Sequence, residues 1–284
     1  MEESRPSRTA FRVATRRAAH QILDRPLVFE DPLALRILDR ETATALEASP
    51  ADFDGSASRA FRAFFAARAR YAEDQLARAV ENGVRQLVIL GAGLDTFAYR
   101  NPHAHCGLRV FEVDHPATQA WKRHRLEQAG IAIPDLLTFA PVNFESQSLR
   151  SGLHDARFDF GRPAFFSWLG VTPYLTKDAF RSTLAVIAEL PAGTAVAFDY
   201  GMDPKLLTLR ERFGLNMLAK RVASANEPFR LFFTPDELSD ELRAAGFKST
   251  EDLGLDEINA RYFANRDDGL RIFSNAGHLA CAWL

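Results

Sequence analysis

Three things are scarce in this sequence: cysteine, net charge and long apolar runs. Only two of the 284 residues are cysteine, Cys106 and Cys281, which excludes a disulfide framework and predicts a reducing, cytoplasmic location. The formal net charge of −2 argues against a protein that holds nucleic acid by electrostatic attraction. No apolar run approaches the roughly 18 residues that a membrane-spanning helix requires, so we expect no membrane partner.

Several motifs of catalysis and metal binding are also missing. The sequence has neither the Gly-x-Ser-x-Gly turn of a serine hydrolase nor the lysine-containing loop that binds nucleotide phosphates. His103, His105 and Cys106 lie close together, but no second ligand pair at zinc spacing accompanies them. We therefore expect no metal site.

What the sequence does contain is a glycine-rich turn directly after an apolar run. Residues 86–90 are suited to a strand buried on both faces, and Gly91 and Gly93 follow at once. A second apolar run, 108–113, ends at Asp114, which is 21 positions after Gly93. An acid at about this distance binds ribose hydroxyls in nucleotide-binding α/β folds. The spacing predicts a small, adenosine-containing cofactor.

Strand and helix patterns alternate from residue 86 onward. Candidate strands lie at 86–90, 108–113, 138–143, 164–168 and 195–200, and helical patterns lie at 58–81, 116–129, 176–190, 204–222 and 234–245. Such alternation predicts an α/β fold with a doubly wound, mostly parallel sheet. Segments 271–275 and 278–283 read as a C-terminal antiparallel hairpin.

The same patterns divide the chain into two parts. Residues 1–84 read as a helical N-terminal arm that could form a lid over a site. Residues 85–284 form the main domain, with a helical insertion at about 204–233. The sequence does not predict an oligomeric state.

The glycine-rich turn supplies the first candidate site residues. We expect the backbone of Gly91, Ala92 and Gly93 to approach a ligand, since ligands bind at the carboxyl ends of parallel strands. Asp95 is either a ligand contact or a helix N-cap. Thr96 stands where a dinucleotide-binding turn has its third glycine. That replacement disfavours a nicotinamide cofactor and suits a ligand without phosphates.

Two acids and one arginine are the charged candidates. Glu112 and Asp114 are two positions apart, so on a strand they share one face. Asp114 lies nearer the strand end and is the better ribose ligand; the alternative is a solvated acid pair. Arg68 lies seven positions after Phe61 on the inward face of its predicted helix. A buried cation needs an anionic partner, which is either a protein carboxylate or the carboxylate of an amino-acid-like ligand.

Three further residues are candidates at the ends of later strands. Asn143 can pair with an adenine edge while Phe144 packs on the ring; the alternative for Asn143 is a turn residue. Trp168 can form a wall of the pocket, although aromatic residues at strand ends also belong to ordinary cores.

Together these segments resemble the leucine carboxyl methyltransferase superfamily, in its bacterial branch of S-adenosylmethionine-dependent methyltransferases. The similar segments are 67–74 (ARARYAED), 90–96 (LGAGLDT), 111–116 (FEVDHP), 168–175 (WLGVTPYL), 198–200 (FDY) and 261–263 (RYF). The resemblance extends from about residue 9 to the end of the chain. It implies a class I methyltransferase fold, which is Rossmann-like, and S-adenosyl-L-methionine as the cofactor.

The resemblance also implies roles for the candidate residues. Arg68 would hold the methionine carboxylate, and the cofactor would lie over Gly91 and Gly93. Asp114 would bind the ribose, and Asn143 would frame the adenine together with Phe144.

Two positions depart from the family pattern. Asn143 replaces the usual Asp, which keeps an acceptor oxygen but removes a charge. Leu169 replaces a Glu that many members have, which puts the identity of the methyl acceptor in doubt.

The resulting hypothesis is an O-methyltransferase acting on a small molecule or an exposed carboxylate. A carboxylate acceptor needs no general base, whereas a hydroxyl acceptor usually does, and no base is identified from the sequence. Two alternatives remain open at this point: a nicotinamide-dependent oxidoreductase on a Rossmann fold, and a cofactor-binding protein without catalysis.

Overall fold

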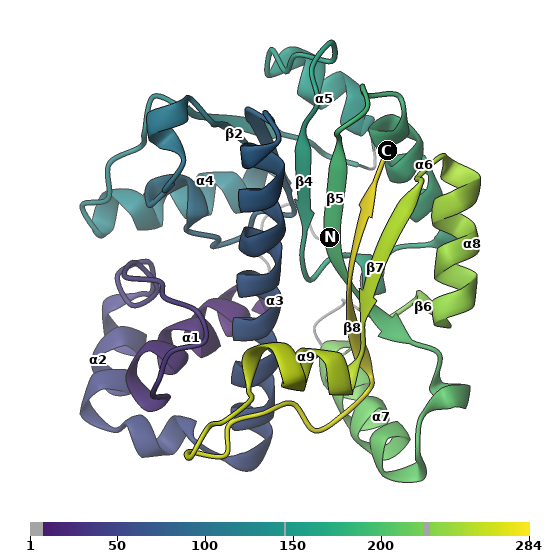
Figure 1. The fold of residues 1–284 in the computed structure, drawn as a ribbon. Helices are drawn as coiled ribbons and strands as arrows, with labels where there is room; N and C mark the ends of the chain where they lie inside the picture. Colours follow the sequence, from purple (N-terminus) through teal and green to yellow (C-terminus); the bar gives the residue numbers. More distant parts are fainter. Residues whose placement is uncertain (1–7, 145, 224–227) are drawn as a thin grey trace.

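The computed structural model describes residues 8–144, 146–223 and 228–284, which build one mixed sheet with helices on both faces (Figure 1). The strands are ordered β3-β2-β1-β4-β5-β8-β7, and β6 pairs with β5. Their bounds are Gln86–Leu90 (β1), Arg109–Asp114 (β2), Leu137–Pro141 (β3), Phe165–Trp168 (β4), Ala195–Met202 (β5), Phe232–Phe233 (β6), Ser249–Leu253 (β7) and Gly277–Trp283 (β8).

The parallel part of the sheet confirms the predicted doubly wound fold. Strands β1 to β5 are parallel, and all five residues of β1 are buried, as an apolar run covered on both faces requires. The chain passes from β1 to β2 on one side and reaches β4 on the other side of β1. The carboxyl ends of β1, β2 and β4 therefore meet where ligands bind in such sheets.

The antiparallel pair at the C-terminal edge is present, but its first strand is not the predicted one. β8 pairs with β5 and with β7, whereas residues 271–275 form no strand. In that segment Ile272 N–H donates to the side chain of Asn259, and the Asn259 amide donates to Ile272 C=O, both over about 3 Å. The Asn259 side chain thus satisfies the backbone of Ile272 without a strand. The edge strand beside β8 is β7, at 249–253.

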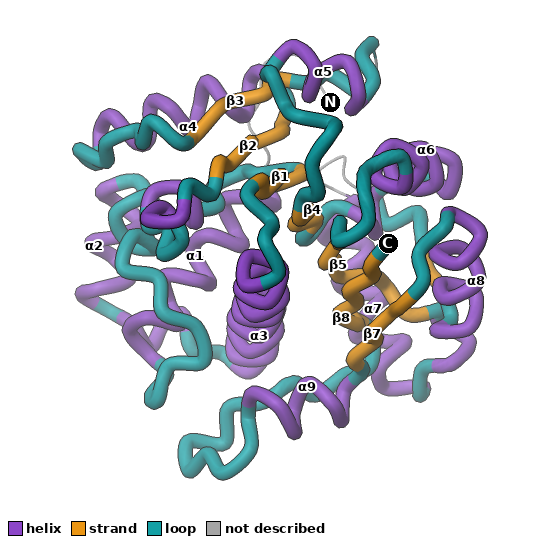
Figure 2. Tube along the Cα trace, turned by 45° about the horizontal axis from the view of Figure 1, so that its top comes forward, coloured by secondary structure: helices purple, strands orange, loops and turns teal. Residues whose placement is uncertain are grey.

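Nine helices lie along the described residues. They are Arg8–Leu23 (α1), Arg40–Ala48 (α2), Ser56–Glu81 (α3), Pro116–Gln128 (α4), Leu149–Asp155 (α5), Lys177–Ala188 (α6), Leu209–Ala223 (α7), Pro235–Ala245 (α8) and Leu255–Tyr262 (α9). Helices α3 and α9 pack on one face of the sheet, and α5, α6 and α8 pack on the other (Figure 2). None of the described helices combines the length and apolar character needed to span a membrane.

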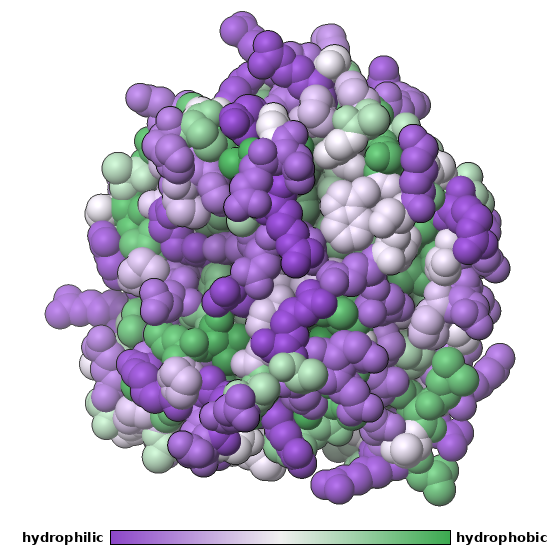
Figure 3. Space-filling view, viewed as in Figure 1, coloured by the Kyte–Doolittle hydropathy of each residue, from purple (hydrophilic) through white to green (hydrophobic). Residues whose placement is uncertain are grey.

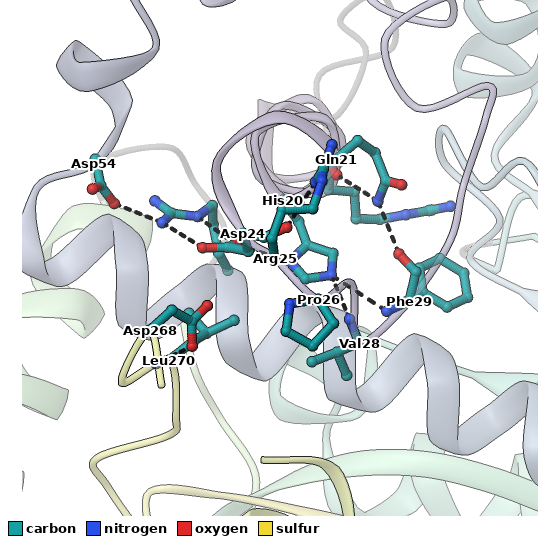
Figure 4. Close-up of polar contacts among 12 residues, drawn as sticks. His20, Gln21, Asp24, Arg25, Pro26, Val28, Phe29, Asp54, Asp268 and Leu270 are labelled. Carbon is teal, nitrogen blue, oxygen red and sulfur yellow. Dashed lines mark hydrogen bonds and ion pairs between the residues drawn. The ribbon is translucent and has the colours of Figure 1, made fainter. Parts of the chain in front are cut away.

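The N-terminal helices are joined to α3 by a buried polar cluster (Figure 4). Asp24 accepts hydrogen bonds from Arg62 Nε and Nη2, both at 3.0 Å, and lies 2.8 Å from His20 Nδ1. His20 Nε2 accepts from the backbone N–H groups of Val28 and Phe29. Burial opposes ionisation of Asp24, but the hydrogen bonds from His20 and Arg62 outweigh it and lower its pKa. This cluster fixes the segment before α2 on the helix that crosses the sheet.

Candidate functional site

The glycine-rich turn lies at the carboxyl end of β1, where the sequence places it. Gly91 and Gly93 have φ angles of +67° and +45°, which side chains other than glycine rarely adopt. The N–H groups of Gly91 and Ala92 both donate to Val113 C=O, at 2.8 and 3.2 Å. These bonds hold the turn against the end of β2.

Asp114 is the polar side chain that this turn brings into position. Its carboxylate accepts hydrogen bonds from Gly93 N–H at 2.6 Å and His115 N–H at 2.7 Å. Burial raises the pKa of Asp114, although these two backbone hydrogen bonds oppose the shift. An ionised carboxylate accepts about four hydrogen bonds, so two acceptor positions remain for the hydroxyl groups of a ligand.

Glu112 shares the face of Asp114 but lies deeper, so the two predicted acids have different environments. Its side chain is fully buried, and Oε2 lies 2.7 Å from Lys122 Nζ on α4. Oε1 is buried without a hydrogen-bond partner among the described residues. Burial raises the pKa of Glu112 to about 7, and Lys122 offsets part of that shift. Glu112 therefore has Lys122 as its partner inside the protein, and Asp114 is the acid at the end of β2.

The raised pKa of Glu112 predicts a pH dependence of stability. The folded protein holds the Glu112 proton more tightly than the unfolded chain, so the free energy of unfolding should fall as pH rises from about 4.5 to about 7. The expected loss is roughly 3 kcal/mol. Urea denaturation at several pH values would measure it. The double variant Glu112→Gln/Lys122→Met should flatten this slope, and an unchanged slope would contradict the assignment.

Asp95 and Thr96 have structural partners. Asp95 Oδ1 accepts from Phe97 N–H at 2.7 Å, but Thr96 and not Asp95 is the N-cap of the 3-10 turn that follows, so Asp95 does not have the N-cap role considered as its alternative. Between β1 and β2 the described residues form only two short 3-10 turns, Phe97–Tyr99 and Ala104–Cys106. A dinucleotide-binding turn instead leads into an α-helix whose N-terminus binds the pyrophosphate. The local structure thus fits a ligand without phosphates better than a nicotinamide dinucleotide.

Thr96 belongs to a buried ionic network that joins the N-terminal region to the glycine-rich turn. Its hydroxyl donates to Asp31 at 2.7 Å and accepts from Arg17 at 2.9 Å. Asp31 also pairs directly with Arg17 and lies 3.5 Å from Arg100 Nε. Arg100 in turn pairs with Glu73 on α3. Arg17 Nη1 also lies 3.5 Å from Asp95, so two cations and three carboxylates meet beside the turn.

Arg68 lies at the carboxyl ends of β4 and β5, and its anionic partner in the structure is a protein carboxylate. Arg68 Nη1 lies 3.0 Å from Asp199 Oδ2, and Gly170 N–H donates to the other oxygen of Asp199 at 2.5 Å. The guanidinium also lies 4.6 Å from the centre of the Phe65 ring. Gly170 has a φ angle of +71°, which favours glycine, and a Cβ added there would lie 2.9 Å from Arg68 Nη2. Asp199 uses one of the five guanidinium N–H groups.

The sequence analysis did not select Asp199 as a site residue. The sequence does contain a feature that could have identified Asp199: it is the one charged residue in β5, a strand in which every residue is buried. A lone acid in such a strand requires a buried partner, and Arg68 is that partner.

A cavity of about 1230 Å³ begins beside Arg68, Gly170 and Asp199. Its walls come from α1, α3, α7, the ends of β4 and β5, and residues 271–277. Gly91 and Asp114 do not line it. A Cβ added to Gly91 would lie 2.4 Å from the Val171 side chain, so the glycine-rich turn directly adjoins the loop at the cavity's inner end. Asp114 and Arg68 thus mark two neighbouring parts of one candidate site.

The remaining candidates differ in their surroundings. Asn143 follows β3, which ends at Pro141, and its C=O accepts from the N–H groups of Ser146 and Gln147, so it has the turn geometry considered as its alternative. Phe144 is 58% exposed and free to pack on a ligand. Trp168 is only 2% exposed and stacks on Phe180 at 5.4 Å. These contacts place the Trp168 side chain in the core, and its role beside a ligand stays a prediction.

Two solved structures share this fold over nearly the whole chain. A "putative methyltransferase" from Thermobifida fusca matches with a TM-score of 0.60 and 17% identity, covering 99% of this chain and 96% of that one. A DUF574 family protein from Streptomyces avermitilis matches with a TM-score of 0.55 and 19% identity, covering 95% and 96%. The strand order and these neighbours define the class I methyltransferase fold.

Sequence comparison identifies the family within this class. The model of the leucine carboxyl methyltransferase family matches residues 10–188. "Putative S-adenosyl-L-methionine-dependent methyltransferase YktD" of Bacillus subtilis is 33% identical, over 98% of each chain. A protein of Mycolicibacterium paratuberculosis with the same functional description is 31% identical over 74% of this chain and 71% of its own length. The chain belongs to the leucine carboxyl methyltransferase family.

Proposed function

We propose that this protein is an O-methyltransferase that methylates an oxygen of a small molecule or of an exposed carboxylate. Membership of the leucine carboxyl methyltransferase family implies methyl transfer from S-adenosyl-L-methionine. The part that we propose is that the acceptor atom is oxygen. The observation that carries the proposal is the adjacency of Asp114, Arg68 and a large cavity at the carboxyl ends of β1, β2, β4 and β5.

The residues present fit this cofactor. Asp114 has acceptor positions left for the two ribose hydroxyls, and the positive-φ turn at Gly91 and Gly93 lets the backbone pass close beneath a ligand. Arg68 has N–H groups beyond the one that Asp199 uses, and these suit an amino-acid carboxylate. Exposed Phe144 offers a ring for stacking on the adenine. When bound, the cofactor supplies an activated methyl group.

The task of the protein is then mainly alignment. Holding donor and acceptor in line can supply roughly 7–11 kcal/mol of barrier lowering. The Arg68–Asp199 pair is well placed for this, because it lies between the glycine-rich turn and the cavity and is fixed by Gly170. We propose that residues 1–84 and the 204–233 insertion act as a lid, since α1 and α7 both contribute to the cavity wall.

We also propose that the protein acts in the cytoplasm. Cys106 and Cys281 are both free in the structure, and Cys281 is buried. Such cysteines are suited to a reducing compartment.

Thermal unfolding with and without S-adenosylhomocysteine tests the cofactor site, with NADH as the comparison ligand. Ligand at about 100 times its dissociation constant should add about 2.7 kcal/mol, or roughly 5–10 °C for a chain of this size. Arg68→Ala should abolish the ligand-induced shift. Arg70→Ala is the matched control, because Arg70 is on the same helix, half exposed and paired only with Asp74 among the described acids. A shift with NADH instead would contradict the proposal.

Transfer of a ¹³C-labelled methyl group in cell extract tests the oxygen acceptor. The chemical shift of the labelled product distinguishes methyl on oxygen from methyl on nitrogen or carbon. Label found on nitrogen alone, with cofactor binding intact, would leave a methyltransferase but reject O-methylation.

A further inference from the structure

We infer that the acceptor is an organic anion with a large aromatic body, whose oxygen is already ionised when it binds. This inference rests on the proposed function and specifies the substrate class of the same site. It follows from the size of the cavity, the side chains of its walls and the way its two carboxylates are occupied.

The cavity is larger than the methionine end of the cofactor requires. Ligand pockets commonly measure about 300–1,000 Å³, and this cavity measures about 1230 Å³ although Asp114 and the glycine-rich turn lie outside its walls. In addition to the residues around Arg68, α7 and residues 271–277 contribute to its walls. The acceptor that fills it has several rings or a comparable apolar bulk.

The walls are strongly aromatic. Seven phenylalanines line the cavity, and they come from α3, α7, β6, the segment before β6 and the loop before β8. Phe61 and Phe65 stack on one wall with ring centres 5.9 Å apart, and Phe229 packs 5.3 Å from Tyr174 on another. Rings arranged in this way favour offset or edge-to-face contact with a further aromatic group.

Charge in the described lining is predominantly positive. Six cationic side chains face two carboxylates, Asp199 and Glu211. Arg16 and Arg271 each lie 5.0 Å from the centre of a phenylalanine ring, Phe61 and Phe273 respectively. A cationic wall lined with rings attracts an anion carried on an aromatic body.

Both carboxylates in the described lining are already engaged. Asp199 binds Arg68 and Gly170 N–H, while Glu211 accepts from Asn275 N–H at 2.7 Å and from the Thr208 hydroxyl at 2.7 Å. The described lining contains no histidine. A neutral alcohol would require a base to remove its proton, whereas a carboxylate or an acidic phenolate would not.

The corresponding reaction balances without a base. The ionised oxygen of the acceptor attacks the methyl carbon of S-adenosylmethionine and forms the O–CH₃ bond. The S–CH₃ bond breaks, and its electron pair stays on sulfur to give S-adenosylhomocysteine. The negative charge of the acceptor and the positive charge of the sulfonium are both lost, and no proton is released.

Two fluorescent probes of similar shape test the predicted preference. Anilinonaphthalene sulfonate carries an anionic group on its aromatic body, and phenylnaphthylamine lacks that group. In the full-length protein the anionic probe should bind about tenfold more tightly. Arg12 and Arg271 are two of the six cationic side chains of the lining, and Arg12→Gln/Arg271→Gln should remove this difference. Arg109→Gln is the matched control, because Arg109 lies 5.0 Å over Phe111 but outside the cavity. Near-UV circular dichroism checks that each variant keeps its tertiary packing.

The rate of methyl transfer to two model acceptors is the second test of the inference. Naphthalene carboxylate should be methylated at least about tenfold faster than naphthalenemethanol, since the alcohol needs a base. Equal binding of the two probes, or equal turnover of the acid and the alcohol, would overturn the inference. In that case a thermal shift with S-adenosylhomocysteine would still support the proposed function. Loss of that shift in the unmodified protein would reject the proposed function, whatever the probes report about the cavity.

Discussion

Replacing Asp31 with alanine should lower the free energy of unfolding by about 3–5 kcal/mol, the usual cost of removing one partner from a buried ion pair. The Asp31 side chain is completely buried between Arg17 and Arg100 and also accepts from the Thr96 hydroxyl. Burial opposes its ionisation, but the two arginines outweigh that effect and lower the pKa of Asp31. Without this carboxylate, Arg17 loses its strongest partner in the interior.

Guanidinium denaturation of the two proteins at neutral pH measures this loss. Asp52→Ala is the control, because Asp52 is exposed in the short turn after α2 and its loss should change stability by at most about 0.5 kcal/mol. A loss below about 1 kcal/mol for Asp31→Ala would mean that the network contributes little to holding the N-terminal region on the sheet.

Asp114→Asn should weaken S-adenosylhomocysteine binding at least about 100-fold. Hydrogen bonds to a charged acceptor contribute about 1.5–3 kcal/mol each, and the proposed role gives Asp114 two ribose hydroxyls in addition to its backbone partners. Asparagine keeps one acceptor oxygen but directs an amide N–H₂ group toward donors.

Isothermal titration calorimetry is the direct measurement for Asp114→Asn. Asp135→Asn is the control, because it makes the same chemical change at an exposed residue in the loop before β3, outside the glycine-rich turn. Affinity within about tenfold of the unmodified protein would remove Asp114 from the cofactor site.

Local patterns predicted that the glycine-rich turn and Asp114 lie together at the carboxyl ends of β1 and β2, as the structure shows. The apolar run 86–90, the glycines after it and the acid at 114 are consecutive features, and the carboxyl ends of adjacent parallel strands must meet. The partner of Arg68 could not be predicted in the same way. Asp199 is 131 positions away from it, and their contact depends on how α3 crosses the sheet.

The errors in the sequence analysis also have physical causes. β7 contains Glu251 and Asp252 and lies at the sheet edge, so it lacks the apolar alternation that identifies a strand. Residues 271–275 have strand-like composition, but the Asn259 side chain satisfies part of their backbone. Trp168 stays a predicted ligand contact, because aromatic side chains form pocket walls and cores alike; in the structure it stacks on Phe180.

Helix α7 buries little of its surface against the rest of the molecule, so its side chains can be substituted with little effect on the fold. Val222 is its buried apolar residue among those described, whereas Leu209, Phe213 and Met217 are 80%, 70% and 55% exposed. Figure 3 shows hydrophobic surface at the lower right of the molecule, in the region that α7 occupies in Figure 1. None of the predicted cofactor contacts belongs to this helix. Substitutions along α7 can therefore reshape the acceptor cavity with little cost to the sheet or to donor binding, so new acceptor preferences can evolve, or be engineered, one side chain at a time.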